Sequence, residues 1–370
     1  MIVTPLAILI FILAFGGMVL VHEFGHFIVA RAFKIEVEEF GIGLPPSALT
    51  LFTWKGTRFT LNWLPLGGFV RPKGENDPNV PGGLAAASPW ARLAVLFAGP
   101  LMNLLTALVI YSLMVTSAGI PVPERILIRS VIKETPAEAA GIQAGDILIA
   151  GQGQKIRSYE DLRNIIDLNE NQPIVFLIDR AGEQLELQVT PRRSGEDQRV
   201  IIGVYYDEQY TSRPINSWLE AVQFGMRATY NSARNLISLP AQLIRGALPA
   251  EQSRLIGFKG IYDIMKYSVA SDLEASQSPS TAPTSSPFDQ MRTLLIVAAL
   301  SISLGIINLF PFPALDGGRI LFVLPELIFR RRVPHQFETL VHGLGMALLL
   351  LLMIYVNVMD FVNPINIPSP

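Results

Sequence analysis

Two histidines and a glutamate lie close together near the start of the chain, in the stretch LVHEFGHF at residues 20–27. On a helix, His22 and His26 are one turn apart and share a face. Two imidazoles at this spacing can hold one metal ion, and Glu23 beside them can act as the general base for an attacking water. The alternative is the polar end of a membrane helix, although Lys and Arg are the residues that usually reach lipid headgroups.

The local motif supplies only two ligands, because nothing like the longer HExxHxxGxxH pattern follows it. Asp316, in the stretch NLFPFPALDGGR at residues 308–319, follows an uncharged run of 23 residues and is the obvious third ligand. Proline breaks the helix before Asp316, and glycine lets the chain turn tightly after it. With water as a fourth ligand, this set matches a catalytic zinc. Asp316 could instead cap the following helix; His335 and His342 are interpreted as structural residues.

The composition favours a membrane part joined to a water-exposed domain. Of the 370 residues, 50% are hydrophobic and 16% are charged, which is too apolar for an ordinary soluble protein. The net charge of −2 gives no indication of nucleic acid binding. The chain has no cysteine, so disulfides and thiolate metal ligands are excluded. The N-terminus lacks a basic region and a cleavage site, and we expect its apolar segment to be retained.

Four uncharged runs, at residues 2–21, 93–115, 293–315 and 339–359, are each long enough to cross a membrane. Lys and Arg occur between the first two runs and between the last two, but not before the first or after the last. The positive-inside rule therefore predicts that both short connections are cytoplasmic and both termini extracytoplasmic. This topology places His22, His26 and Asp316 toward the same side of the membrane.

Residues 40–74 alternate apolar and polar side chains between Gly and Pro clusters, which predicts short strands or hairpins, for instance at 49–54 and 57–63. Strand edges at membrane depth are tolerated beside protein or a water-filled cavity. These hairpins either line the entrance to the active site and pair with an extended substrate, or they form a cytoplasmic cap with no role in substrate binding.

Residues 123–206 have the strand and helix pattern of a water-exposed α+β domain, and the stretch at 134–166 resembles a PDZ domain of bacterial membrane proteases. That resemblance implies a groove that accepts peptide by β-augmentation; the alternative is a rigid spacer. The region 207–290 is predicted to contain amphipathic helices at 215–267 and a flexible linker at 271–287, rich in Ser, Thr and Pro.

Several motifs together resemble the site-2 protease family of intramembrane zinc metalloproteases: HEFGH, FGIG, GPLMN in the second run, the single PDZ-like domain and NLFPFPALDGGR. The order of parts is most similar to the bacterial branch that cleaves anti-sigma factors and signal-peptide remnants. The resemblance implies that Asn308 holds the substrate or the oxyanion, and that Gly99 and Asn103 face the site. From composition alone, ordinary small-residue helix packing with an interhelical hydrogen bond is the favoured role for Gly99 and Asn103.

These observations predict an α-helical membrane protein with about four transmembrane helices, a membrane-associated β-hairpin region and one α+β PDZ-like extracytoplasmic domain. The expected divisions are two membrane parts with the PDZ-like domain and the amphipathic region between them, at 1–122, 123–206, 207–290 and 291–370. A bacterial plasma membrane is the expected location, with a thylakoid or organellar membrane left open.

The function that the resemblance implies is hydrolysis of a peptide bond within the transmembrane helix of single-span membrane proteins, in regulated intramembrane proteolysis. Zinc is the implied cofactor, the lipid bilayer the setting, and an upstream protease a partner in the cascade; nucleic acid is not a partner. A non-proteolytic membrane adaptor that binds partners through the PDZ-like domain is the alternative. A metal-ion transporter is a weaker one, because the second and fourth runs offer few ionisable groups along a path.

Overall fold

The computed structural model describes residues 3–75, 77–194, 199–244, 254–277 and 286–365. The chain divides into two compact units. Unit 1 comprises residues 1–113, 221–273 and 291–370, and unit 2 comprises residues 114–220 and 274–290. The candidate site residues all belong to unit 1, so the two units are described separately.

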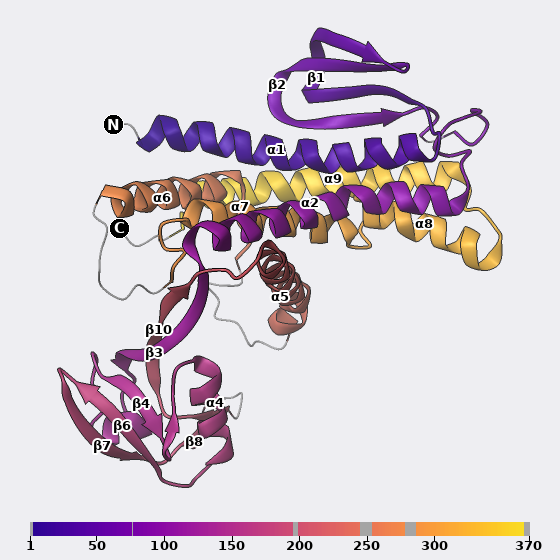
Figure 1. The fold of residues 1–370 in the computed structure, drawn as a ribbon. Helices are drawn as coiled ribbons and strands as arrows, with labels where there is room; N and C mark the ends of the chain where they lie inside the picture. The colour runs from indigo at the N-terminus through magenta and orange to yellow at the C-terminus, as the bar shows by residue number, and fades with distance from the viewer. Residues whose placement is uncertain (1–2, 76, 195–198, 245–253, 278–285, 366–370) are drawn as a thin grey trace. The chain divides into compact units, whose positions relative to one another are not determined.

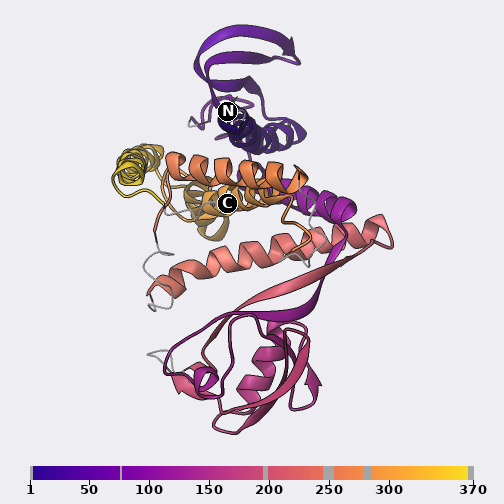
Figure 2. The ribbon, with the colours of Figure 1, turned by 90° about the vertical axis from the view of Figure 1, so that its left-hand side faces the viewer.

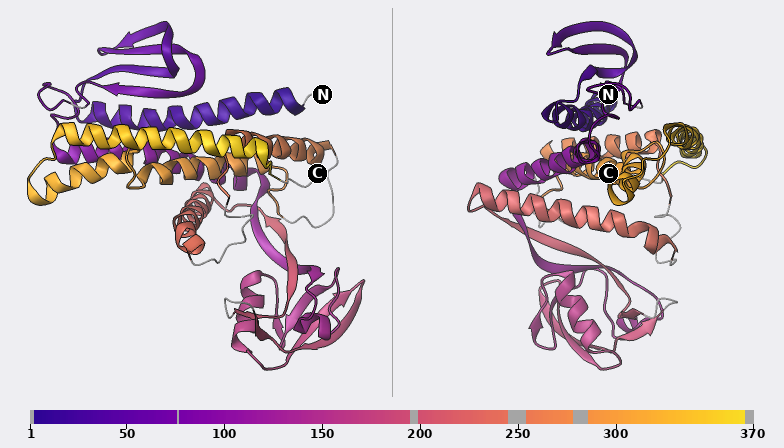
Figure 3. Two further views of the ribbon diagram at one scale, coloured as in Figure 1. Left: turned by 180° about the vertical axis from the view of Figure 1, so that it is seen from behind. Right: turned by 90° about the vertical axis from the view of Figure 1, so that its right-hand side faces the viewer.

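Unit 1 is built on long apolar helices that run side by side (Figures 1 and 3). Four of the described helices have the length and composition to cross a membrane: α1 (Val3–Ala32), α2 (Pro89–Ala118), α7 (Arg292–Leu309) and α9 (His335–Val362). Each of them overlaps one of the four predicted uncharged runs. Within each helix the backbone groups bond to one another, as an apolar environment requires.

The third apolar run is shorter as a helix than as a sequence pattern, because α7 ends at Leu309 rather than at residue 315. Pro311 and Pro313 follow and cannot continue the helix. Helix α8 (Asp316–Phe329) then begins with Asp316 itself. Its N-cap residue is Leu315, and no side-chain capping bond forms there, so the capping role considered for Asp316 is not seen.

The predicted hairpin is present, and its strands are longer than expected: β1 is Val37–Trp54 and β2 is Thr57–Pro72. A turn with positive φ at Lys55 (48°) and Gly56 (85°) joins them. Both strands bend, so β1 pairs through residues 37–42 with both 68–72 and 58–61, and through 47–54 with 57–62. The resulting sheet lies along α1 (Figures 1 and 2), and its segment 68–72 forms one edge.

Close contacts fix α1, α2, α7 and α8 around the candidate site. A Cβ at Gly25 of α1 would lie 2.4 Å from the Ala98 carbonyl oxygen of α2, so the two helices approach closely there. The Ser301 hydroxyl of α7 donates to the Asn103 carbonyl of α2 at 2.8 Å. Arg92, which is buried at the start of α2, forms an ion pair at 2.6 Å with Glu326 of α8.

The predicted amphipathic region contains α5 (Trp218–Ile244) and α6 (Phe258–Gln277). Figure 1 shows α5 end-on, crosswise to the other helices of unit 1. Helix α6 continues through Gln277, so the first part of the predicted linker 271–287 is wrong: it is helical. Residues 278–285 of that prediction lie outside the described residues.

Unit 2 contains an antiparallel sheet with the strand order β10-β3-β4-β6-β7, in which β5 also pairs with β4. The strands of this unit are β3 (Ile120–Val131), β4 (Ile147–Gly151), β5 (Gln154–Lys155), β6 (Ile174–Arg180), β7 (Glu183–Val189), β8 (Arg192–Ser194), β9 (Arg199–Ile201) and β10 (Val204–Arg213). They contain the strands expected from the sequence.

Two short helices complete unit 2, α3 (Pro136–Ala139) and α4 (Tyr159–Leu168). Alternate residues of β6 point inward, and Ile174, Phe176 and Ile178 are fully buried. They pack in one apolar core with Leu162 and Ile165 of α4. The described part of residues 123–206 therefore has the α+β structure that the sequence predicts for this region.

Candidate metal centre

Three side chains from distant parts of the chain converge in unit 1. The Nε2 atoms of His22 and His26 lie 3.1 Å apart, and Oδ2 of Asp316 lies 3.1 Å from the first and 3.3 Å from the second. Both histidines are buried, and the Asp316 side chain is 16% exposed. Among the residues that the structure describes, these three are the group whose ligand atoms could share one metal ion.

The triangle of ligand atoms has the dimensions of a zinc site. In a tetrahedron with metal–ligand bonds of about 2.0–2.1 Å, neighbouring ligand atoms lie about 3.3 Å apart. The observed separations of 3.1–3.3 Å match three corners of such a tetrahedron. Two nitrogens and one carboxylate oxygen are donors that zinc accepts, and three protein ligands leave a fourth position open.

Helix α2 supplies the groups that orient both imidazoles. Nδ1 of His26 donates to the Val95 carbonyl oxygen at 2.7 Å, which leaves the lone pair of a neutral ring on Nε2. The Asn103 side-chain amide lies 3.1 Å from Nδ1 of His22 and is fully buried. The atom placed nearest the ring is Nδ2. If the amide is turned by 180°, its oxygen accepts the proton of Nδ1, and the lone pair of Nε2 stays toward the site.

Gly99 of α2 stands directly against the two ligand atoms. A Cβ at this position would lie 2.4 Å from Nε2 of His26 and 2.7 Å from Nε2 of His22. No side chain fits in that space, so α2 can approach the site only with glycine here. Gly99 and Asn103 of the GPLMN motif therefore both adjoin the candidate ligands. Gly99 leaves room for the two imidazoles, and Asn103 contacts Nδ1 of His22.

A cavity of about 290 Å³ adjoins the candidate ligands, and Glu23 lines it together with His22, His26, Asp316 and Asn308. Its Oε2 accepts a hydrogen bond from the backbone N–H of Val70 at 3.0 Å. Val70 belongs to the edge segment 68–72 of the β1–β2 sheet. Of the two alternatives for the hairpin region, the one that lines the site agrees with this geometry.

Asn308 lines the cavity from the end of α7, where its Nδ2 donates to the Leu304 carbonyl at 2.9 Å. The second N–H of this amide can donate to another group, and its oxygen can accept. Arg319 and Glu75 also line the cavity and form an ion pair with each other. No motif in the sequence marks this pair. The one local signal is the charge of Arg319, three positions after Asp316.

The fold and the site define a protein with a two-histidine, one-carboxylate metal centre and a neighbouring glutamate, set among long apolar helices. The sequence pattern of peptidase family M50 matches residues 10–352. A protein of Clostridium perfringens is 32% identical over 358 residues, which cover 96% of this chain and 98% of its own. The zinc metalloprotease RasP of Geobacillus kaustophilus is 28% identical, covering 96% of this chain and 98% of its own.

The chain therefore belongs to peptidase family M50, the site-2 protease family, as the sequence motifs indicated. Among solved structures, the PDZ domain of an SdrC-like protein from Listeria monocytogenes matches with 15% identity and a TM-score of 0.21. That match covers 24% of this chain and 90% of the Listeria domain.

Proposed function

We propose that this protein is an intramembrane zinc metalloprotease that hydrolyses a peptide bond within the transmembrane helix of a single-span membrane protein. The observation that carries the proposal is the triangle of His22, His26 and Asp316, whose edges of 3.1–3.3 Å fit zinc. Its family membership and the naming of RasP as a zinc metalloprotease support the same chemistry.

His22, His26 and Asp316 would hold the zinc ion. When bound, zinc polarises the scissile carbonyl and makes a water molecule acidic enough to attack near neutral pH. The two histidines are buried, and burial strengthens these electrostatic effects. Asn308 lines the same cavity, where the free N–H of its amide could donate to the oxyanion or hold the substrate backbone.

Glu23 is the proposed general base. Its carboxylate takes a proton from the attacking water and later delivers that proton to the leaving amine. The bond from the Val70 N–H fixes Oε2, so that Oε1 is the oxygen available for proton transfer. Helix α1 carries Glu23 and two of the ligands, which keeps the base and the metal site in a constant relationship.

The edge segment 68–72 is the proposed docking site for the substrate. A transmembrane helix hides its carbonyl groups in its own hydrogen bonds, so the substrate must unwind locally before it can react. Segment 68–72 pairs with residues 37–42 on one side, while the Val70 N–H points to Glu23 on the other. An unwound substrate strand could pair with this edge beside the metal site.

The proposed topology places α1, α2, α7 and α9 across the bilayer, with the metal site toward the cytoplasmic face. The named relatives are bacterial, which supports a plasma membrane location. Unit 2, with the predicted PDZ-like domain, would lie on the extracytoplasmic side. There it would exclude proteins with large outer domains, so that an upstream protease must trim the substrate first.

The test is cleavage of a single-span membrane protein, tagged at both ends and co-expressed with the full chain. Replacement Glu23→Gln keeps the shape of the side chain but removes the base. We expect cleavage to fall by about 100-fold or more, while the purified variant keeps its zinc.

Glu38→Gln is the matched control, because Glu38 is an exposed carboxylate outside the cavity. Fragment masses from the wild type would also locate the cleaved bond. If the Glu23→Gln variant cleaves within about tenfold of the wild type, Glu23 is not the base.

A further inference from the structure

The loop that presents Asp316 contains few hydrogen bonds of its own. Pro311 and Pro313 have no N–H, and the amides of Phe312 and Leu315 bond within the loop, to the carbonyls of Phe310 and Phe312. Ala314 adopts a φ of 79°, a left-handed conformation that a residue with a Cβ rarely adopts. Contacts outside the loop must therefore hold this conformation.

Helix α9 provides one of these contacts through His342. The backbone N–H of Ala314 donates to Nδ1 of His342 at 2.9 Å. A neutral imidazole has one N–H and one lone pair, so the ring proton of His342 lies on Nε2. Nε2 is buried and has no hydrogen-bond partner among the described residues, which leaves Nδ1 as the atom that joins His342 to the loop.

A second contact lies one turn further along α9. A Cβ at Gly345 would lie 2.3 Å from Cβ of Pro313 and 2.8 Å from its carbonyl oxygen. Helix α9 and the loop therefore touch backbone to backbone, and glycine makes this approach possible. A Cβ at Gly343, on the same helix, would have no neighbouring atom within 4 Å, so Gly343 is under no such restriction.

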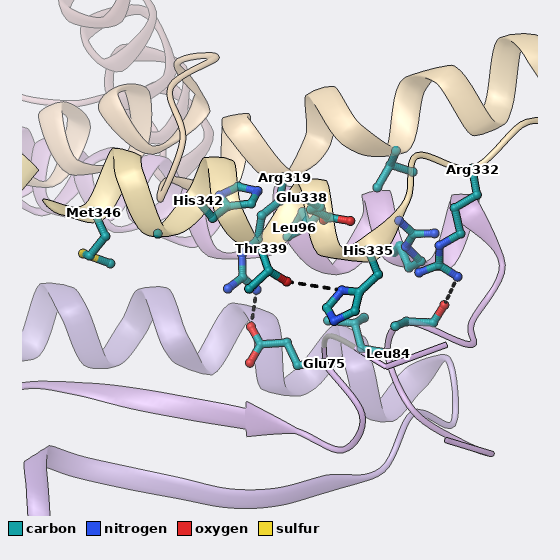
Figure 4. Close-up of a pocket in the computed structure, with 14 residues that line it drawn as sticks. Glu75, Leu84, Leu96, Arg319, Arg332, His335, Glu338, Thr339, His342 and Met346 are labelled. Carbon is teal, nitrogen blue, oxygen red and sulfur yellow. Dashed lines mark hydrogen bonds and ion pairs between the residues drawn. The ribbon is translucent and has the colours of Figure 1, made fainter. Parts of the chain in front are cut away.

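His342 does not line the cavity beside the candidate metal ligands. His342 lines a second cavity of about 290 Å³ between α8, α9 and the segment after β2, shown in Figure 4. The two cavities share the lining residues Glu75, Leu84, Leu96 and Arg319, and Glu75 and Arg319 form an ion pair with each other. The His342 ring also packs against Phe322 of α8, at 5.3 Å between centroids, so its position is fixed from two sides.

We propose that His342 is a positioning residue for Asp316: through Nδ1 and the Ala314 N–H, α9 holds the loop so that the carboxylate meets His22 and His26. Gly345 permits the close approach that this bond requires. The inference deepens the proposed function, since it rests on Asp316 being a zinc ligand. Replacing a residue that orients a metal ligand commonly lowers the metal affinity by about 10–100-fold.

Three replacements of His342 distinguish the roles of its two nitrogens. The side-chain oxygen of Asn can occupy the place of Nδ1, whereas that of Gln reaches toward the place of Nε2, and Ala has neither. Zn²⁺ affinity is measured by chelator competition on the purified full chain. We expect His342→Ala and His342→Gln to raise the zinc Kd by about tenfold or more, and His342→Asn to restore most of the affinity.

A pair of glycine replacements provides a test that does not alter His342. Gly345→Ala is expected to weaken zinc binding as His342→Ala does, while Gly343→Ala, on the same helix, leaves it unchanged. Hydrogen exchange of the metal-free protein gives a readout independent of zinc. The Ala314 amide should exchange faster in His342→Ala and Gly345→Ala than in the wild type or Gly343→Ala.

The outcomes separate this inference from the proposed function. If His342→Ala and Gly345→Ala keep wild-type zinc affinity and Ala314 exchange, or if Asn fails to replace His, the positioning role is wrong. If the wild type binds no zinc, the proposed function is wrong instead. The exchange measurement still decides in that case whether His342 holds the loop.

Discussion

Nε2 of His22 lies 3.1 Å from Oδ2 of Asp316, although 294 residues separate them in the sequence. The contact joins the first apolar helix to the start of α8, and both side chains are largely shielded from solvent. Burying a carboxylate in an apolar helix bundle is unfavourable unless cationic or metal partners balance its charge. The buried cluster of His22, His26 and Asp316 is therefore most stable when a metal cation or a protonated histidine balances the carboxylate.

Replacing Asp316 with Asn tests the carboxylate as a ligand. The amide keeps nearly the same shape but loses the charge, so zinc occupancy of the purified protein should fall by about tenfold or more. Elemental analysis of the metal content measures this directly. Asp289→Asn, a carboxylate outside the cavity, serves as the control; unchanged occupancy in Asp316→Asn would remove Asp316 from the ligand set.

Replacing Gly99 with Ala should displace the two histidine ligands, because the added Cβ would lie 2.4 Å from one Nε2 atom and 2.7 Å from the other. We expect a loss of zinc affinity of about 10–100-fold, with the helical content of the protein unchanged. Gly17→Ala on α1, where nothing lies within 4 Å of the new Cβ, is the matched control. Wild-type affinity in Gly99→Ala would show that α2 does not closely border the metal.

The ligands could be predicted from the sequence because their side chains carry the signal. His22 and His26 share a helical face by spacing alone, and Asp316 is conspicuous as a carboxylate after a long uncharged run. The groups that orient them carry no such signal. The Val95 carbonyl that receives the His26 N–H, and the Val70 N–H that reaches Glu23, are backbone atoms present in every residue.

The fold was predictable to a similar degree. Hydropathy located the four apolar helices, but α7 ends six residues early because the prolines after it override the apolar pattern. Alternation located the hairpin, although its long bent strands depend on pairing that no local pattern specifies. Ser, Thr and Pro content predicted a linker where α6 still continues, since tertiary packing outweighs weak local preferences.

Replacing Val70 with Pro tests the edge segment beside Glu23. Proline removes the N–H that donates to Glu23 and blocks strand addition at that position. Cleavage of a transmembrane substrate should fall by about tenfold or more, while zinc content remains that of the wild type. Val70→Ala keeps the N–H and should retain most of the activity. Equal activity of the Pro and Ala variants would contradict a role for this edge.

Asp146 should make the stability of unit 2 sensitive to acid. Its buried carboxylate accepts from Arg180 Nε at 2.7 Å and from the Gln143 N–H at 2.8 Å. Burial alone raises the pKa of Asp146, but these hydrogen bonds outweigh burial and hold that pKa below its ordinary value. The stabilisation is therefore complete above about pH 4 and is lost as the pH falls through the lowered pKa of the folded state.

Hydrogen exchange of the full chain, corrected for the intrinsic pH dependence, measures this effect. In the wild type, protection of the β4 and β6 amides should be steady from pH 6 to about pH 4 and should fall as the pH is lowered further. Asp146→Asn should be less stable at pH 6, by about 1–3 kcal/mol, and should change less with pH. Asp167→Asn, which removes a half-exposed surface pair, should behave as the wild type; an equal pH dependence in Asp146→Asn would contradict the assignment.

The most direct test of the central claim is zinc-edge X-ray absorption of the purified full chain. We predict one zinc per chain, with two imidazole nitrogens and one carboxylate oxygen at about 2.0–2.1 Å. The imidazole signal should disappear when His22 and His26 are replaced together by Ala. A chain that binds no zinc, or zinc whose coordination lacks imidazole, would contradict the account.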